Sequence, residues 1–177
     1  MTISLIIVAL FIVVLVILVA KQPTEFRVER SQAISAPVSV VFEQVSNLHS
    51  WAAWSPWDKM EPDVKKTFEG PASGIGASYA WVGKKTGTGR MVTIESKAAQ
   101  LLRFDLKFEK PFKAHNVAEF TFSPQSDQTL VTWSMTGENN LMGKIFGLIV
   151  NCNKMVGGQF EEGLKNLKTV SEQTVTV

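Results

Sequence analysis

The chain has 177 residues, one cysteine and a formal net charge of +2 at pH 7. The single Cys152 excludes an internal disulfide and a zinc site built from cysteines. The small charge is spread along the chain, with no basic run that interleaves aromatic residues, and this argues against nucleic acid as a partner.

The first 20 residues carry no charged side chain, and every residue from Leu5 to Ala20 is apolar. At about 1.5 Å per residue, a helix of this length matches the roughly 30 Å hydrocarbon core of a bilayer. No basic residue precedes the run, and a secretory signal has only about 7–15 apolar residues, so a retained anchor is favoured over a cleaved signal. We therefore predict a transmembrane anchor at 1–21, with membrane contact through residues 1–20, and a linker at 22–24.

The predicted orientation depends on the basic residues near the apolar run. Lys21, Arg27 and Arg30 follow the run, and this Lys/Arg bias favours a single-pass protein with a cytoplasmic domain. An anchor that leaves the domain on the outer side is the alternative, because few residues precede the run.

Alternation of apolar and polar residues predicts an antiparallel sheet in the rest of the chain. The clearest strand is Leu101–Glu109, in which one face is apolar and the other is charged, as expected for a sheet that is packed on one side. A short helical segment, opened by Pro37, follows the first strand. The predicted strands are Phe26–Ile34, Val64–Glu69, Ala77–Val82, Thr88–Lys97, Leu101–Glu109, Lys113–Phe122 and Thr129–Thr136.

The end of the chain is predicted to be one long amphipathic helix. From Cys152 to Val170, apolar residues recur every three or four positions. Loops cannot cover such a helix, so it must lie across the packed face of the sheet. We predict an α+β domain over residues 25–173, in which a curved antiparallel sheet of about seven strands wraps around this helix, and a disordered tail at 174–177.

Five short motifs follow one another through this domain: Ala36-Pro37, Trp54-Ser55-Pro56-Trp57, Gly74-Ile75-Gly76-Ala77-Ser78-Tyr79, Val131-Thr132-Trp133 and Phe160-Glu161-Glu162-Gly163-Leu164. In this order, from about Glu25 to Ser171, they resemble the START/polyketide cyclase-like (SRPBCC) superfamily. The resemblance implies a helix-grip fold with a deep apolar cavity, which in many members takes a lipid, sterol, polyketide or other apolar ligand. It does not fix an activity, because the fold hosts carriers, cyclases, oxygenase subunits and chaperone activators. No catalytic motif of the family can be carried over.

The predicted ligand-contacting residues are large aromatic or apolar side chains and one arginine: Trp51, Trp54, Trp57, Tyr79, Trp81, Arg90, Phe104, Phe120, Trp133, Met135 and Phe160. The first three tryptophans form either an aromatic wall at a ligand entrance, a wedge at a membrane interface, or plain packing beneath the sheet edge. Arg90 either points inward to pair with a ligand carboxylate or phosphate, or extends outward at the sheet edge.

No catalytic residue, metal or cofactor is predicted. The chain has no GxGxxG before a helix, no phosphate loop, no HExxH, no GxSxG and no cluster of histidines and carboxylates. His115 falls on the predicted wet face, and His49 is interpreted as a helix cap. The apolar run Leu141–Val150 is either a gate over the cavity, a second membrane contact, or a helix end buried by its own domain.

Three functions stay open. The first is a membrane-anchored binding or transfer domain for a lipid-like or polyketide-like hydrophobic ligand. The second is a polyketide cyclase or dehydratase, which needs a buried acid–base group that the sequence does not reveal. The third is a non-enzymatic protein-interaction module at the membrane, with protein partners unknown. The lack of a catalytic motif favours a protein that is not an enzyme.

Overall fold

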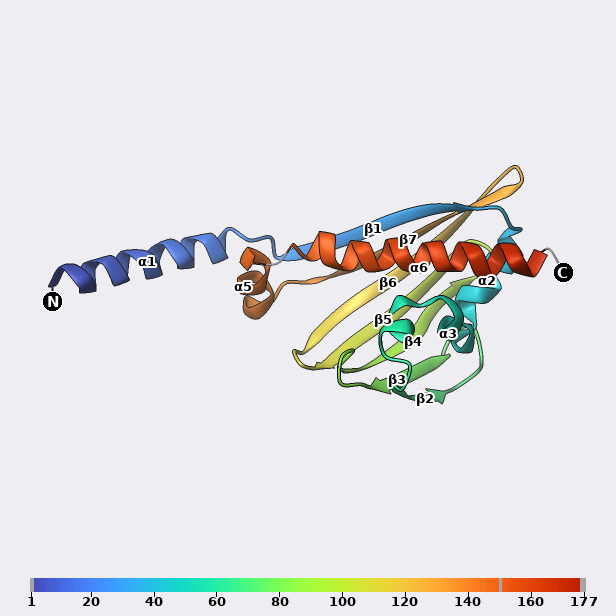
Figure 1. Cartoon of the computed structure of the whole chain (residues 1–177), viewed down its shortest axis with the longest axis horizontal. Coiled ribbons are helices and arrows are strands. Elements are labelled where there is room, and N and C mark those ends of the chain that lie inside the picture. Colours follow the sequence, from blue (N-terminus) through green and yellow to red (C-terminus); the bar gives the residue numbers. More distant parts are fainter. Residues whose placement is uncertain (1, 150, 176–177) are drawn as a thin grey trace.

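The computed structural model describes the backbone of residues 2–149 and 151–175, and their side chains except those of 2–6, 8, 9, 11, 146 and 149. A seven-stranded sheet carries one long helix across one face, while the N-terminal helix extends away from the domain (Figure 1). The elements are α1 (Thr2–Ala20), β1 (Glu25–Ile34), α2 (Val38–Ser46), the 3₁₀ helix η1 (Leu48–Ser50), α3 (Trp51–Trp54), α4 (Pro56–Met60), β2 (Lys65–Glu69), β3 (Ser78–Val82), β4 (Thr88–Lys97), β5 (Leu101–Lys110), β6 (Ala114–Gln125), β7 (Gln128–Glu138), α5 (Leu141–Ile149) and α6 (Cys152–Val175).

The sheet is antiparallel throughout, with strand order β1-β7-β6-β5-β4-β3-β2. Strands β2 to β7 follow one another as neighbours, and β1 returns to pair with β7. The predicted α+β class and the seven-stranded antiparallel sheet are confirmed. On the packed face, the register places Phe120 opposite Trp133 and Phe104 opposite Ala118.

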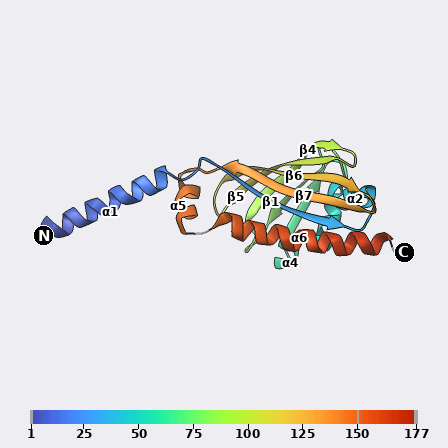
Figure 2. The same ribbon diagram turned by 90° about the horizontal axis from the view of Figure 1, so that it is seen from above.

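Helix α6 lies across the sheet and runs along β1, as both views show (Figures 1 and 2). Its apolar stripe is buried, with Phe160, Leu164 and Leu167 at most 1% exposed. Gly157 lets the guanidinium of Arg30 lie against the helix, where that group donates to Glu161 Oε1 at 2.5 Å and to the Asn153 carbonyl at 3.1 Å. The predicted long C-terminal helix is confirmed. It continues through Val175, and residues 176–177 lie outside the described residues.

The core between α6 and the middle of the sheet is aromatic. Trp54, Phe104 and Phe120 are each fully buried. The Trp51 ring meets Phe104 edge-on, with 5.6 Å between ring centroids. Helices α2, α3 and α4 all contact α6, so the short helices close one end of the space between α6 and the sheet.

The N-terminal region departs from the sequence prediction. Spanning a bilayer takes about 20 consecutive apolar residues. Among the helices in the described part of the chain, none is long and apolar enough to cross a membrane. The prediction of a single-pass membrane protein is therefore wrong, and the structure does not support the predicted transmembrane anchor at 1–21.

Helix α5 forms most of the apolar run Leu141–Val150, which the sequence analysis interpreted as a gate, a second membrane contact or a buried helix end. It lies beside α1, on the side of the domain away from α2 (Figure 1). Leu141 and Met142 are more than half exposed, so the described part of the helix is not buried by the domain. None of its described residues lines the cavity below α6. Val150 lies outside the described residues.

Candidate functional site

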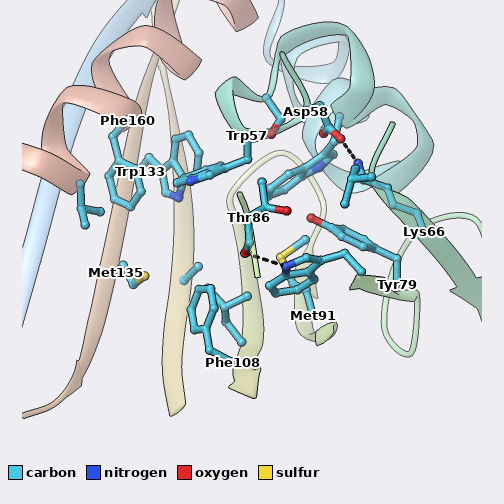
Figure 3. Close-up of a pocket in the computed structure, with 17 residues that line it drawn as sticks. Trp57, Asp58, Lys66, Tyr79, Thr86, Met91, Phe108, Trp133, Met135 and Phe160 are labelled. Carbon is cyan, nitrogen blue, oxygen red and sulfur yellow. Dashed lines mark hydrogen bonds and ion pairs between the residues drawn. The ribbon is translucent and has the colours of Figure 1, made fainter. Parts of the chain in front are cut away.

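A cavity of about 190 Å³ lies between the sheet, α6 and the short helices α3 and α4 (Figure 3). Its wall is built from residue pairs two positions apart on one strand, because such residues point to the same face of a sheet. Most of the wall is aromatic or aliphatic. The pairs are Tyr79 and Trp81 on β3, Leu106 and Phe108 on β5, and Trp133 and Met135 on β7.

The structure brings together seven of the eleven predicted ligand-contacting residues. Those that line the cavity are Trp51, Trp57, Tyr79, Trp81, Trp133, Met135 and Phe160. Trp54, Phe104 and Phe120 belong instead to the packed core, where none of them is exposed to solvent or to the cavity. For the seven residues that line the cavity, contact with a ligand stays a prediction. Trp54, Phe104 and Phe120 are packed too deeply to make such a contact.

The three closely spaced tryptophans have different surroundings. The indole nitrogen of Trp51 donates to the Val45 carbonyl at 2.8 Å, and that of Trp54 donates to the Gln44 carbonyl at 3.1 Å. These bonds fasten α3 to the end of α2, so Trp54 packs the interior and Trp51 both packs it and forms part of the cavity wall. Trp57 is partly exposed and meets the Trp133 ring edge-on at 5.5 Å.

Arg90 lies outside the cavity. Its neighbours Gly89 and Met91 are both buried, so the arginine points to the opposite face. There its guanidinium donates to Glu69 Oε2 at 2.9 Å, with more than half of each side chain exposed. Of the two alternatives for Arg90, the side chain follows the outward one, and it does not reach the cavity.

The sequence prediction missed Asp58 and Lys66, which form a polar corner of the cavity together with Tyr79. The Lys66 ammonium forms an ion pair with the Asp58 carboxylate, and only 15% and 12% of these side chains are exposed. The same ammonium lies 5.0 Å from the centre of the Tyr79 ring. Burial, and then the Asp58 charge, raise the pKa of the Tyr79 phenol, which is therefore neutral at physiological pH.

One signal in the sequence could have revealed this corner. Lys66 is two positions from Val64 and from Phe68, so it shares a strand face with two apolar residues. A lysine at such a position indicates a buried partner. The partner itself, Asp58, comes from α4, and only the folded arrangement places it beside β2.

The loop between β3 and β4 forms another part of the wall through Thr86. The Glu61 carboxylate, at the end of α4, accepts hydrogen bonds from the backbone N–H groups of Lys84 at 2.6 Å, Lys85 at 3.0 Å and Thr86 at 2.9 Å. The N–H groups of Thr86 and Lys84 are the main reason that the pKa of Glu61 is lowered to about 2. The Thr86 carbonyl in turn accepts from the Trp81 indole at 3.2 Å, so Glu61 holds the loop against the cavity.

The histidines and acidic residues do not assemble a metal site. Within the described part of the chain, no group of three or more His, Cys, Asp or Glu side chains could hold a metal ion. His115 is exposed and pairs with Asp105 on the outer face of the sheet, away from the cavity. His49 stacks on Phe68 with 3.9 Å between ring centroids. The site is therefore an apolar cavity with one neutralised ion pair and one neutral phenol at its edge.

Comparison with known proteins places this cavity in a familiar architecture. Protein CV1439 from Chromobacterium violaceum superposes with a TM-score of 0.60 at 15% identity, over 85% of this chain and 99% of its own. Protein MLL2253 from Mesorhizobium loti gives 0.63 at 13% identity, over 84% and 98%. The di-domain ARO/CYC StfQ from the steffimycin biosynthetic pathway gives 0.62 at 11% identity, over 87% of this chain and 53% of its own.

These identities are low, so the three structures establish the shared fold alone. No curated protein matches the sequence at a significant level. The profile of the family described as "Polyketide cyclase / dehydrase and lipid transport" does match, over residues 25–172. This match covers β1 through nearly all of α6, including every wall of the cavity. The chain therefore belongs to the polyketide cyclase/dehydrase and lipid transport family.

Proposed function

We propose that the domain binds a compact hydrophobic ligand in the cavity between the sheet, α4 and α6. The observation that carries the proposal is the composition of the wall, in which aromatic rings and aliphatic chains surround space that the protein leaves empty. Burial of apolar ligand surface there contributes about 25 cal/mol per Å². A closed interior without a ligand site would fill this volume with its own side chains.

The size of the cavity favours a ligand with one or two rings. A cavity of about 150 Å³ lined by aliphatic and aromatic side chains binds benzene, and this cavity measures about 190 Å³. Sites for drug-sized ligands occupy about 300–1,000 Å³. A polyketide-derived ring or another small cyclic molecule therefore fits better than a lipid with two long acyl chains.

Binding can be tested by isothermal titration calorimetry with the two-ring probe 2-methylnaphthalene and the full-length chain. Ala118 lies in the cavity wall on β6, so Ala118→Leu fills the space. Ala114, four residues earlier on the same strand, is exposed, and Ala114→Leu is the matched control. We expect Ala118→Leu to weaken probe binding about tenfold or more, the loss expected when about 1.4 kcal/mol of contact is blocked, and the control to leave it unchanged. Equal binding by all three proteins would contradict the proposal.

A cyclase or dehydratase is the second candidate, and the polar corner is the observation that favours it. A ring closure needs a group that donates or accepts a proton beside the substrate. The neutral Tyr79 phenol, next to the Lys66 and Asp58 pair, is such a donor. With a linear poly-β-ketone as substrate, Tyr79→Phe should then lower turnover by about 100-fold or more while probe affinity stays within twofold. Absence of turnover in the unaltered protein would leave the binding function alone.

A further inference from the structure

Among the buried tryptophans, Trp133 differs in what its indole nitrogen contacts. The indole N–H groups of Trp51, Trp54 and Trp81 each donate to a backbone carbonyl, at 2.8, 3.1 and 3.2 Å. Trp133 is only 2% exposed, yet its Nε1 has no hydrogen-bond partner among the described residues. Buried indole N–H groups normally find an acceptor, so this donor requires an explanation.

The ring of Trp133 is clamped and cannot turn toward another partner. Phe160 stacks on one side at 4.1 Å with 9° between the ring planes, and Phe120 stacks at 4.7 Å. Helix α6 presses on the same ring through Gly163, where an added Cβ would come within 2.8 Å of Trp133 Cζ3. The direction of the N–H bond is therefore set by the packing of β7, β6 and α6.

The residue that carries the unpaired donor stands in the wall of the cavity. Trp133 lines the cavity together with Met135 and Phe160, and these three side chains form one side of it in Figure 3. The other side, with Tyr79 and Lys66, lies across the open space. A ligand in that space would meet the Trp133 ring and could supply an acceptor without moving the clamp.

The charge of the wall indicates what kind of acceptor this is. The ionic side chains that line the cavity are Asp58 and Lys66, and they neutralise one another. An anionic ligand would enter a low-dielectric space with no free cation, and desolvation would oppose its binding. A neutral oxygen has no such cost and matches a neutral indole donor.

We propose that Trp133 selects the ligand by its polarity: the ligand is a neutral ring compound whose carbonyl or ether oxygen accepts a hydrogen bond from Trp133 Nε1. This assignment rests on the proposed binding function and adds the polar group that the ligand must carry. The apolar remainder of the ligand contacts Phe108, Met135 and Trp57. Trp133 is thus a specificity-determining residue and not merely part of the core.

Two probes that differ in one atom group test the assignment. 2-Acetylnaphthalene carries a carbonyl oxygen, and 2-isopropenylnaphthalene has a methylene group in its place. The affinity of the full-length chain for each probe is measured by isothermal titration calorimetry. Trp133→Phe keeps an aromatic ring in the clamp but removes the donor. We expect it to weaken the ketone about five- to tenfold, the value of one neutral hydrogen bond, and to change the affinity for the alkene less than twofold.

Trp81→Phe is the matched control, because Trp81 also lines the cavity but its N–H is already bonded to Thr86. It should change the two affinities by the same factor. Equal losses for both probes in Trp133→Phe would overturn the assignment and leave the binding function intact. Failure of the unaltered protein to bind either probe would instead overturn the proposed function, and the assignment with it.

A second measurement does not depend on the folding of a variant. In the ¹⁵N-labelled unaltered protein, the indole N–H proton of Trp133 should move downfield when 2-acetylnaphthalene binds. The alkene should leave it near its starting position. The N–H proton of Trp81, which is already hydrogen-bonded, should respond alike to both probes. A Trp133 signal that responds alike to both would overturn the assignment.

Discussion

The two ends of the space between the sheet and α6 contain the same kinds of residues and differ in whether they are filled. At the packed end, Trp54, Phe104 and Phe120 are fully buried, and the rings of Trp54 and Phe104 each meet Phe120 edge-on. At the hollow end, Tyr79 and Trp81 line empty space. Aromatic content therefore does not distinguish a filled interior from a ligand cavity.

The covering elements explain the difference. At the packed end, α3 inserts two indoles whose N–H groups are fastened to α2. At the hollow end, the cover is α4 and β2, and β2 is an edge strand whose residues are mostly exposed. A polar ion pair takes the place of a large ring there, so the space behind it stays open.

The largest effect should come from a pair of substitutions on one strand. Phe104 and Leu106 share a face of β5, two residues apart, but Phe104 lies at the packed end and Leu106 in the cavity wall. Phe104→Ala should lower the free energy of unfolding by about 3–5 kcal/mol, because it leaves a new void in a close-packed region. Leu106→Ala only enlarges an existing space, so we expect the low end of the range for such truncations, about 2 kcal/mol. Urea unfolding measures both.

If the two variants lose equal stability, or if Leu106→Ala loses more, the hollow end is as well packed as the end that contains Phe104. The cavity would then be closed in solution. In the expected case, probe affinity should change only in Leu106→Ala.

The ion pair at the cavity edge should give the next largest effect. Lys66→Met leaves the Asp58 carboxylate about seven-eighths buried without its cation, since only 12% of that side chain is exposed. We expect a loss of about 1–3 kcal/mol in urea unfolding. The double variant Lys66→Met with Asp58→Leu should recover most of it, because a pair replaced by apolar side chains leaves no charge behind. A double variant as unstable as the single one would show that the charges themselves do not cause the loss.

Gly163→Ala should have a smaller net effect, since two opposing terms partly cancel. Alanine is favoured over glycine within a helix by about 0.5–1 kcal/mol. The added Cβ, however, would lie 2.8 Å from Trp133 Cζ3 and 3.1 Å from Pro56 Cδ, and overpacking costs about 1–3 kcal/mol. We expect a net loss of about 1 kcal/mol. Gly158→Ala, which meets nothing within 4 Å, is the control and should be neutral or stabilising.

The sequence predicted the fold well and the site only in part. The strand alternation of Leu101–Glu109 and the helical spacing after Cys152 depend on which face is buried, and that information is local. On β4, however, both parities carry apolar residues, Met91 on one and Val92 on the other. A register shift between Thr93 and Glu95 disturbs the alternation further. The neighbouring residues in the sequence therefore do not show whether Arg90 points inward or outward.

The packed and hollow ends could not be told apart from the sequence, because the difference depends on contacts between distant segments. Trp54 reaches Phe120, 66 positions later, and Lys66 meets Asp58 across the α4–β2 connection. Neither contact follows from periodicity. The same holds for the unpaired N–H of Trp133, since the sequence does not show which tryptophans find a carbonyl.

The smallest effect concerns the loop that Glu61 holds against the hollow end, and it should depend on pH. The pKa of Glu61 is lowered from its ordinary value of 4.5 to about 2 in the folded protein, because the N–H groups of Thr86 and Lys84 stabilise the carboxylate. A carboxyl group whose pKa is lowered by folding stabilises the folded state at pH values above its pKa in the unfolded chain. This contribution is lost as the pH falls through the pKa of the group in the folded state. The melting temperature of the unaltered protein should therefore exceed that of Glu61→Gln above pH 4.5, and the difference should shrink toward zero as pH approaches 2.

The difference in melting temperature between the two proteins does not include the contribution of other carboxylates with lowered pKa values, such as Glu95, because both proteins contain them. Glu162→Gln, on the exposed side of α6, controls for the loss of one charge and should show no such convergence. If Glu61 shapes the wall through Thr86, the Glu61→Gln variant should also bind 2-methylnaphthalene more weakly at pH 7. A stability difference that stays constant from pH 7 to pH 2 would mean that the carboxylate charge does not hold the loop, and that the hollow end is closed by the Trp81 and Thr86 contact alone.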